Sequence, residues 1–307
     1  MTKPDIEFGD FAASPATPRL AGAISRVAKA LDELGAWPSH DFAPYRIMLV
    51  PGNAIDTRWG ALASRRPGRT MEINPQSPLR IEIGIDLFTQ GVCRSLASAG
   101  NVSNEVVLFH LLAHEIFHLT ELDRMSRSAV PYGQQNSGFA KALRPDFHAR
   151  WREAGLTLSE KFPLVRLGAA NAASLPPQKR FGLECWRAAD VASEACADLL
   201  ALNLMRKASQ PYAAGVANFT PALLAHRQAE EDRALAAGST ANPGYQIGTA
   251  LSELLQRGPM TDQDIVASTW DKAFRLACTA PEIFPEVRAL IEGLPSLTFA
   301  ASKGPKI

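Results

Sequence analysis

The sequence predicts an α+β fold that is mostly helical and contains one small sheet. Apolar residues recur at three- and four-residue spacing in NEVVLFHLLAHEIFHLTELDRM, directly after Ser103, which is typical of a long helix. An Ala- and Leu-rich stretch from about Leu183 to Lys207 predicts a second long helix. Alternating apolar and polar residues in Arg80–Leu87 predict a strand. The chain has no internal repeat, so we expect several helices around a few strands.

The first helix is expected to start at Thr17-Pro18, where a capping residue precedes a proline at the first helical position. The amphipathic segment RLAGAISRVAKALDELG follows, and Gly35 provides a stop signal. Further strands are expected at Arg46–Val50 and around Met71–Ile73, because both segments are rich in strand-forming residues and lie between turn signals.

The Arg80–Leu87 strand is expected to bury one face and to turn the other, with Glu82 and Asp86, toward solvent or a ligand. We also expect it to form an edge of the sheet, where an extended peptide could pair with its backbone. Later helices are expected at Pro221–Ala237, near Gln246–Gln256 and at Asp262–Ala280, and the tail after Gly293 is expected to fray.

Composition excludes several classes of function. The 32 Lys and Arg residues nearly balance the 31 Asp and Glu residues, so no broad basic surface for nucleic acid is expected. No stretch approaches the roughly 18 to 20 uninterrupted apolar residues of a membrane helix, so no membrane insertion is expected. Four scattered cysteines and the absence of an export signal in MTKPDIEFGDF favour a soluble, cytoplasmic protein.

His114-Glu115-Ile116-Phe117-His118 is an H-E-x-x-H motif inside the first long helix after Ser103. Four helical residues advance the direction of a side chain by only about 40° while rising about one turn, so both imidazoles point the same way. Two neutral imidazoles in this arrangement suit zinc, and Glu115 is placed to act as general base on a water at the metal. His110, one turn earlier, is expected to lie in the core or behind the ligands.

A catalytic zinc site needs a third protein ligand and an open position, and Glu194-Ala-Cys-Ala-Asp198 can supply that ligand. Glu194 is the expected third ligand, and Asp198 the expected acceptor for the outer N–H of a liganding histidine. Asp190 and Glu184 are alternative ligands. A zinc protease class with a third histidine ligand is disfavoured, because the position six residues after His118 is Arg124.

The two motifs together resemble the gluzincin metallopeptidases of the HtpX-like and CAAX-prenyl-protease group. The segment from Asn104 to His118 is similar to the family pattern D-E-L-x-x-V-L-A-H-E-x-x-H, and residues 194–198 match its E-x-x-A-D motif. The resemblance covers about Ile81 to Asp198. It implies a zincin-like domain in which a small sheet packs on the H-E-x-x-H helix, without the membrane helices of that group.

We therefore expect an N-terminal helical segment over residues 1–40, a zincin-like metallopeptidase domain over 41–237 and a C-terminal helical extension over 238–307. The family often has a histidine-proline segment followed by acids and an arginine. The stretch from His226 to Arg233 resembles it, although the proline is missing. The resemblance thus implies His226 as the oxyanion donor beside the general base Glu115.

The expected function is that of a zinc-dependent endopeptidase, which hydrolyses peptide bonds of a protein or peptide substrate with a zinc-bound water activated by Glu115. One alternative is a non-catalytic, zinc-stabilised structural or protein-interaction module with closed coordination. Another is a helical scaffold that carries the motif by chance. The sequence contains no signature of cleavage specificity or oligomeric state.

Overall fold

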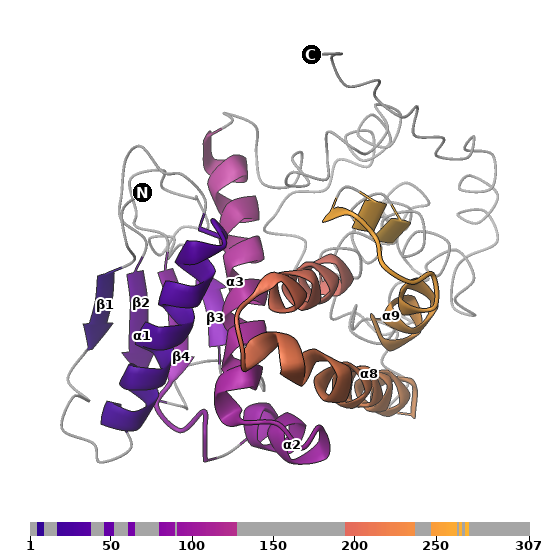
Figure 1. Ribbon diagram of the computed structural model, residues 1–307, viewed down its shortest axis with the longest axis horizontal. Helices are drawn as coiled ribbons and strands as arrows, with labels where there is room; N and C mark the ends of the chain where they lie inside the picture. Colours follow the sequence, from indigo (N-terminus) through magenta and orange to yellow (C-terminus); the bar gives the residue numbers. More distant parts are fainter. Residues whose placement is uncertain are drawn as a thin grey trace, which may run out of the picture.

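The computed structural model describes residues 5–8, 17–37, 46–51, 61–64, 80–89, 91–127, 194–236, 247–262, 264–265 and 268–269. In these ranges most residues are helical, and four short strands form one sheet (Figure 1). The predicted α+β, mostly helical fold is therefore confirmed. The expected strand near Met71–Ile73, the first part of the Leu183–Lys207 helix and the tail after Gly293 lie outside the described residues.

The sheet has the order β1-β2-β4-β3 and mixes parallel and antiparallel pairs. Its strands are β1 (Asp5–Phe8), β2 (Arg46–Val50), β3 (Ala61–Ser64) and β4 (Arg80–Gly84). Strand β2 runs parallel to both β1 and β4, and β3 pairs antiparallel with β4. Of the two strands that the sequence predicted in the described ranges, β2 has the predicted bounds, whereas β1 and β3 were not predicted.

Strand β4 corrects two expectations. It ends at Gly84, before a turn over residues 85–89, and it lies between β2 and β3, so it is not an edge of the sheet. Glu82 does not face solvent either, because it is buried and its carboxylate lies 2.9 Å from Nε of Arg80. Alternation cannot distinguish an exposed acid from a buried, paired one.

Helix α1 (Thr17–Glu33) confirms the first predicted helix. Its end is closed by Gly35, whose φ of 65° is readily available only to glycine. There the N–H groups of Gly35 and Ala36 donate to the carbonyls of Asp32 and Leu31, a pairing that satisfies the last turn. The buried face of α1 packs against α3, so this helix belongs to the main core.

Helix α2 (Gly91–Ala99) leads into α3 (Asn104–Arg127), the predicted helix that carries the H-E-x-x-H motif. The Ser103 hydroxyl accepts a hydrogen bond from the Val106 N–H and caps the start of α3. Every residue from 106 to 116 is buried, because α1, α2, α8, β3 and β4 surround the helix. The expected packing of the sheet on this helix is thus observed.

The remaining helices are the segment 194–207, α8 (Tyr212–Ala236) and α9 (Ile247–Leu255). Helix α8 starts nine residues before the expected position, and Pro221 lies inside it. Proline has no N–H to donate to the carbonyl of Ala217, four residues earlier. Both residues lie on the exposed side of the helix, where water can bind that carbonyl. None of the helices in the described ranges has the length and hydropathy of a membrane span.

The expected three-part division of the chain stays a prediction. The first 40 residues contribute a strand, β1, as well as a helix, and β1 pairs with β2. Side chains of α1, α3, α8 and the sheet share one hydrophobic cluster. Helix α9 packs on α8.

Candidate metal centre

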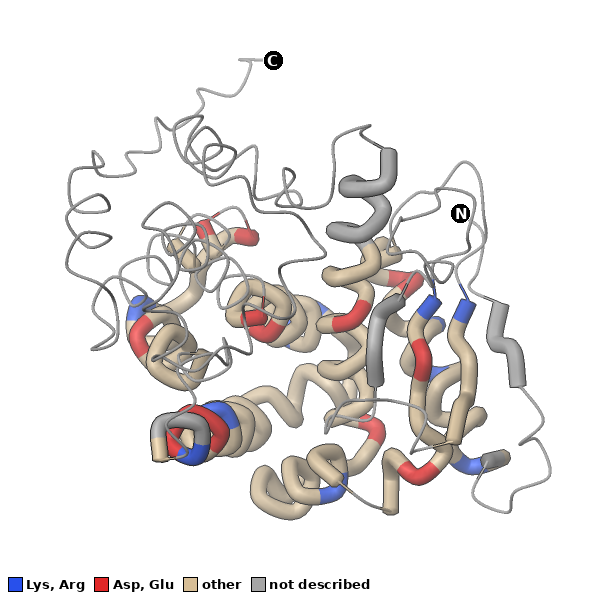
Figure 2. Tube along the Cα trace, turned by 180° about the vertical axis from the view of Figure 1, so that it is seen from behind, with Lys and Arg blue, Asp and Glu red and all other residues tan. Residues whose placement is uncertain are grey.

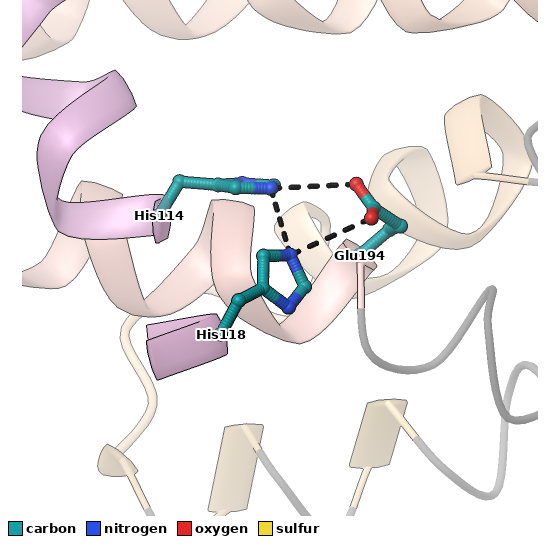
Figure 3. A group of neighbouring side chains, drawn as sticks. All are labelled: His114, His118 and Glu194. Atoms are coloured by element: carbon teal, nitrogen blue, oxygen red, sulfur yellow. Dashed lines mark hydrogen bonds and ion pairs between the residues drawn. The ribbon is translucent and has the colours of Figure 1, made fainter. Parts of the chain in front are cut away.

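Helix α3 presents His114 and His118 from the same side, as expected for residues one turn apart (Figure 3). Their Nε2 atoms lie 3.0 Å apart. The His114 side chain is 8% exposed and that of His118 is 18% exposed, so the pair sits at the rim of the core. Both imidazoles point toward Glu194, which comes from a helix far away in the sequence.

Glu194 is the first described residue of the segment 194–207, and its carboxylate spans the two imidazoles (Figure 3). Oε2 lies 3.3 Å from Nε2 of His114, and Oε1 lies 3.5 Å from Nε2 of His118. One donor atom from each of the three residues falls within 4.8 Å of the others, a set that could hold a metal ion. The structure therefore brings together the three ligands that the sequence predicted.

The distances between the donor atoms suit a small cation with nitrogen and oxygen ligands. Bonds of about 2.0–2.1 Å in a tetrahedron place neighbouring donor atoms roughly 3.3–3.4 Å apart. The nitrogen–nitrogen and nitrogen–oxygen distances of 3.0, 3.3 and 3.5 Å scatter around that value. A tetrahedral ion held by these three donor atoms would have one further coordination position.

Asp198, one turn after Glu194, lies behind His114 as the sequence predicted. The Nδ1–H of His114 donates to Oδ1 of the fully buried Asp198 at 2.8 Å. This bond directs the Nε2 lone pair of the neutral imidazole toward Glu194 and His118. Burial alone would lower the pKa of His114, but Asp198 and Glu194 raise it to about 9, so a metal must displace a proton there.

Arg227 of α8 is the residue of this site that the sequence analysis missed. Its Nε donates to Oδ2 of Asp198 at 2.9 Å, and Nη2 donates to Oε2 of Glu194 at 3.4 Å. Burial would raise the pKa of both carboxyl groups, yet His114 and His118 hold the pKa of Glu194 below its ordinary range, and Arg227 and His114 do the same for Asp198. The second half of α8 carries basic and acidic residues close together (Figure 2).

His110 lies one turn before His114, completely buried. Its Nε2 is 3.5 Å from Oδ1 of Asp198, and its ring packs 4.9 Å from the ring of Phe219. Burial lowers the pKa of His110 to about 3, against the opposing effect of Asp198, so the ring is neutral at physiological pH. It is a core residue behind the ligands, as expected, and its donor atoms are not among the three that converge.

The other residues that the sequence analysis singled out are the expected general base, the expected oxyanion donor, Arg233 and the alternative ligands. Glu115 is buried on α3 beside His114. His226 lies on α8 with Nε2 3.6 Å from Oε1 of Glu230, and its part in catalysis stays a prediction. Arg233 is exposed and donates to the carbonyl of Ala229 in its own helix. Glu184 and Asp190, the alternative ligands, lie outside the described residues.

Comparisons with protein-family models, curated proteins and solved structures find no match for this chain. Two imidazoles and one carboxylate, with a buried acid behind the first imidazole, form a donor set that could hold a metal ion.

Proposed function

We propose that the protein is a zinc-dependent endopeptidase of gluzincin type, with His114, His118 and Glu194 as metal ligands. The convergence of these three donor groups from two distant segments, with Glu115 next to His114 in the chain, carries the proposal. A chance H-E-x-x-H sequence would have no reason to meet a carboxylate 76 residues further along the chain, nor an aspartate placed behind one of its imidazoles.

Zinc in such a site polarises a scissile carbonyl and lowers the pKa of a bound water. Glu115, next to His114 in the motif, takes the proton of the attacking water and delivers it to the leaving amine. Asp198 keeps His114 in the tautomer that offers Nε2 for coordination. His226 is proposed as the donor that stabilises the oxyanion, on the basis of the family resemblance alone.

Strand β3 replaces β4 as the proposed docking edge for substrate. It is the last strand on its side of the described sheet, and it packs next to α3. An edge strand offers unpaired N–H and C=O groups, to which an extended peptide can bind by main-chain hydrogen bonds. Recognition through the backbone would tolerate varied side chains, which fits a peptide or protein substrate without a narrow sequence motif.

Glu115→Gln is the direct test. The variant is expected to retain stoichiometric zinc and to lose at least about 100-fold in the turnover of a mixed peptide library, because the general base is removed while the ligands remain. Zinc content is measured by elemental analysis and cleavage by mass spectrometry. Glu33→Gln, an exposed acid on α1, is the matched control and should cleave like the wild type.

Undiminished cleavage by Glu115→Gln would refute the mechanism. If the wild-type protein binds zinc tightly yet cleaves no peptide, the site is instead that of a zinc-stabilised structural or interaction module. Spectroscopy would then show a protein side chain in the fourth position. If the purified protein binds no metal and its melting temperature does not respond to a chelator, it is a helical scaffold with a fortuitous motif.

A further inference from the structure

Arg227 uses each of its guanidinium nitrogens on a different carboxylate. Nε reaches Asp198, Nη2 reaches Glu194, and Nη1 donates to Oε2 of Glu230 at 3.3 Å. Of these acids, Glu194 is the third proposed metal ligand, and Asp198 accepts the hydrogen bond that orients His114, the first one. We propose that Arg227 is a positioning residue that preassembles the metal centre, an inference that rests on the proposed function.

Glu194 is the most exposed of the three proposed ligands. Its side chain is 37% exposed, whereas those of His114 and His118 on α3 are 8% and 18% exposed. A glutamate loses rotamer entropy when it is fixed, and Asp198, one turn away, repels its charge. A cation that contacts both carboxylates removes this repulsion and holds Glu194 toward the imidazoles before any metal binds.

The guanidinium group suits this role better than an ammonium group. Its nitrogens form a rigid planar fork, and here the fork contacts Asp198 and Glu194 at the same time. Lysine would bring the same charge on a single nitrogen. A lysine could neutralise one of the carboxylates but could not fix the orientation of both relative to each other. Arg227→Lys therefore removes the geometry of the fork and keeps the charge, whereas Arg227→Gln removes the charge.

The backbone behind Arg227 is itself held tightly. Gly248 of α9 packs on α8 so closely that an added Cβ would lie 2.7 Å from Cα of Gln228 and 2.9 Å from the carbonyl carbon of Arg227. The hydroxyl and N–H of Thr249 both donate to Glu231 and fasten the start of α9 to α8. Arg227 therefore extends from a fixed point on α8, as a residue that orients others must.

The test measures zinc affinity in competition with a chromophoric chelator for Arg227→Gln and Arg227→Lys. Changing a residue that orients ligands typically costs 10- to 100-fold in metal affinity. We expect a loss of that size for Arg227→Gln and an intermediate loss for Arg227→Lys. Arg233→Gln, an exposed arginine on the same helix, should bind zinc like the wild type. The absorption spectrum of the cobalt-substituted protein should also differ from wild type in the two Arg227 variants and match wild type in Arg233→Gln.

A double-mutant cycle separates positioning from simple stabilisation of the fold. In a Glu194→Ala background, Arg227→Gln should cost clearly less zinc affinity than in the wild-type background, because one of the two acids through which it acts is already absent. An equal loss in both backgrounds, or wild-type affinity and cobalt spectra in both single variants, would overturn the proposal. Arg227→Lys keeps the charge that offsets the buried acids and supplies the measurement if the glutamine variant does not fold.

The two proposals fail differently. If the wild-type protein binds neither zinc nor cobalt, the metal centre itself is refuted, and with it the proposed function. If the wild-type protein binds zinc and both Arg227 variants bind it equally well, only the role of Arg227 is refuted, and the centre is organised by the interior of α3 and by Asp198.

Discussion

The two halves of the metal centre are built in different ways. The imidazole half comes from one turn of α3, where His114 and His118 are aligned by helix geometry alone. The acidic half combines Glu194 and Asp198 from the segment 194–207 with Arg227 from α8, three charged groups whose meeting depends on how the two helices pack. One half is set by local structure, and the other is set by tertiary structure.

The fold depends more on the acidic half of the site than on the imidazole half. Asp198 is fully buried and tied to both α3 and α8, so the acidic half links three helices. Removing one partner of a buried charged network leaves the others uncompensated and is strongly destabilising. His118 lies nearer the surface, with a side chain that is 18% exposed. Mutations in the two halves should therefore separate metal binding from folding.

The largest expected effect is that of His118→Ala on zinc affinity. The binding free energy of a four-ligand zinc site is roughly 10–16 kcal/mol. If its ligands share this energy, the loss of one costs several kcal/mol, or at least about 100-fold in zinc affinity. The thermal stability of the metal-free protein should stay within about 1 kcal/mol of wild type, because the side chain lies at the rim. Chelator competition and calorimetry measure the two quantities. Equal zinc affinity in the variant would contradict the ligand assignment.

The imidazole half could be predicted from sequence because its information is local. The spacing of His114 and His118 fixes their common side once the helix is recognised, and the apolar period of α3 is unmistakable. Glu194 and Asp198 are predicted from the need for a third ligand and from their four-residue spacing on one helix, and the resemblance supports the same pair. The structure places both where these arguments put them.

Arg227 shows where such reasoning stops. It is one of several charged residues on α8, and nothing in its spacing marks it as a partner of Asp198. The resemblance directed attention to its neighbour His226 and to Arg233, yet the face that α8 turns toward the segment 194–207 is decided by tertiary packing. The same limit explains β4, because its alternation is visible in the sequence but its pairing with β2 and β3 is not.

Asp198→Asn tests the acidic half. Compared with His118→Ala, it should lower zinc affinity less and lower the stability of the metal-free protein more. Zinc affinity is expected to fall 10- to 100-fold, because the outer N–H of His114 loses its charged acceptor. The metal-free protein should lose about 3 kcal/mol or more, because Arg227 stays buried opposite a neutral amide. Denaturant unfolding after chelation measures this loss. A metal-free stability equal to that of His118→Ala would show that the two halves do not differ.

The smallest expected effect concerns His110, which packs between the halves and faces Asp198, His114 and Arg227. Its pKa is about 3 in the folded protein and near 6.5 when unfolded, so between these values only the unfolded chain binds the proton. Its contribution to stability is complete above pH 6.5 and is lost as the pH falls, by on the order of 1 kcal/mol per pH unit.

His110→Gln removes this titration without adding bulk. After chelation, the wild-type protein should lose more unfolding free energy than the variant between pH 7.5 and pH 5, by about 1–2 kcal/mol, as measured by denaturant titration at each pH. Subtracting one protein from the other isolates His110, because His114 and the carboxylates are present in both. Parallel pH profiles would mean that water or a proton reaches His110 in the folded state. The boundary between the two halves would then be open to solvent rather than sealed by the packing of α3 against α8.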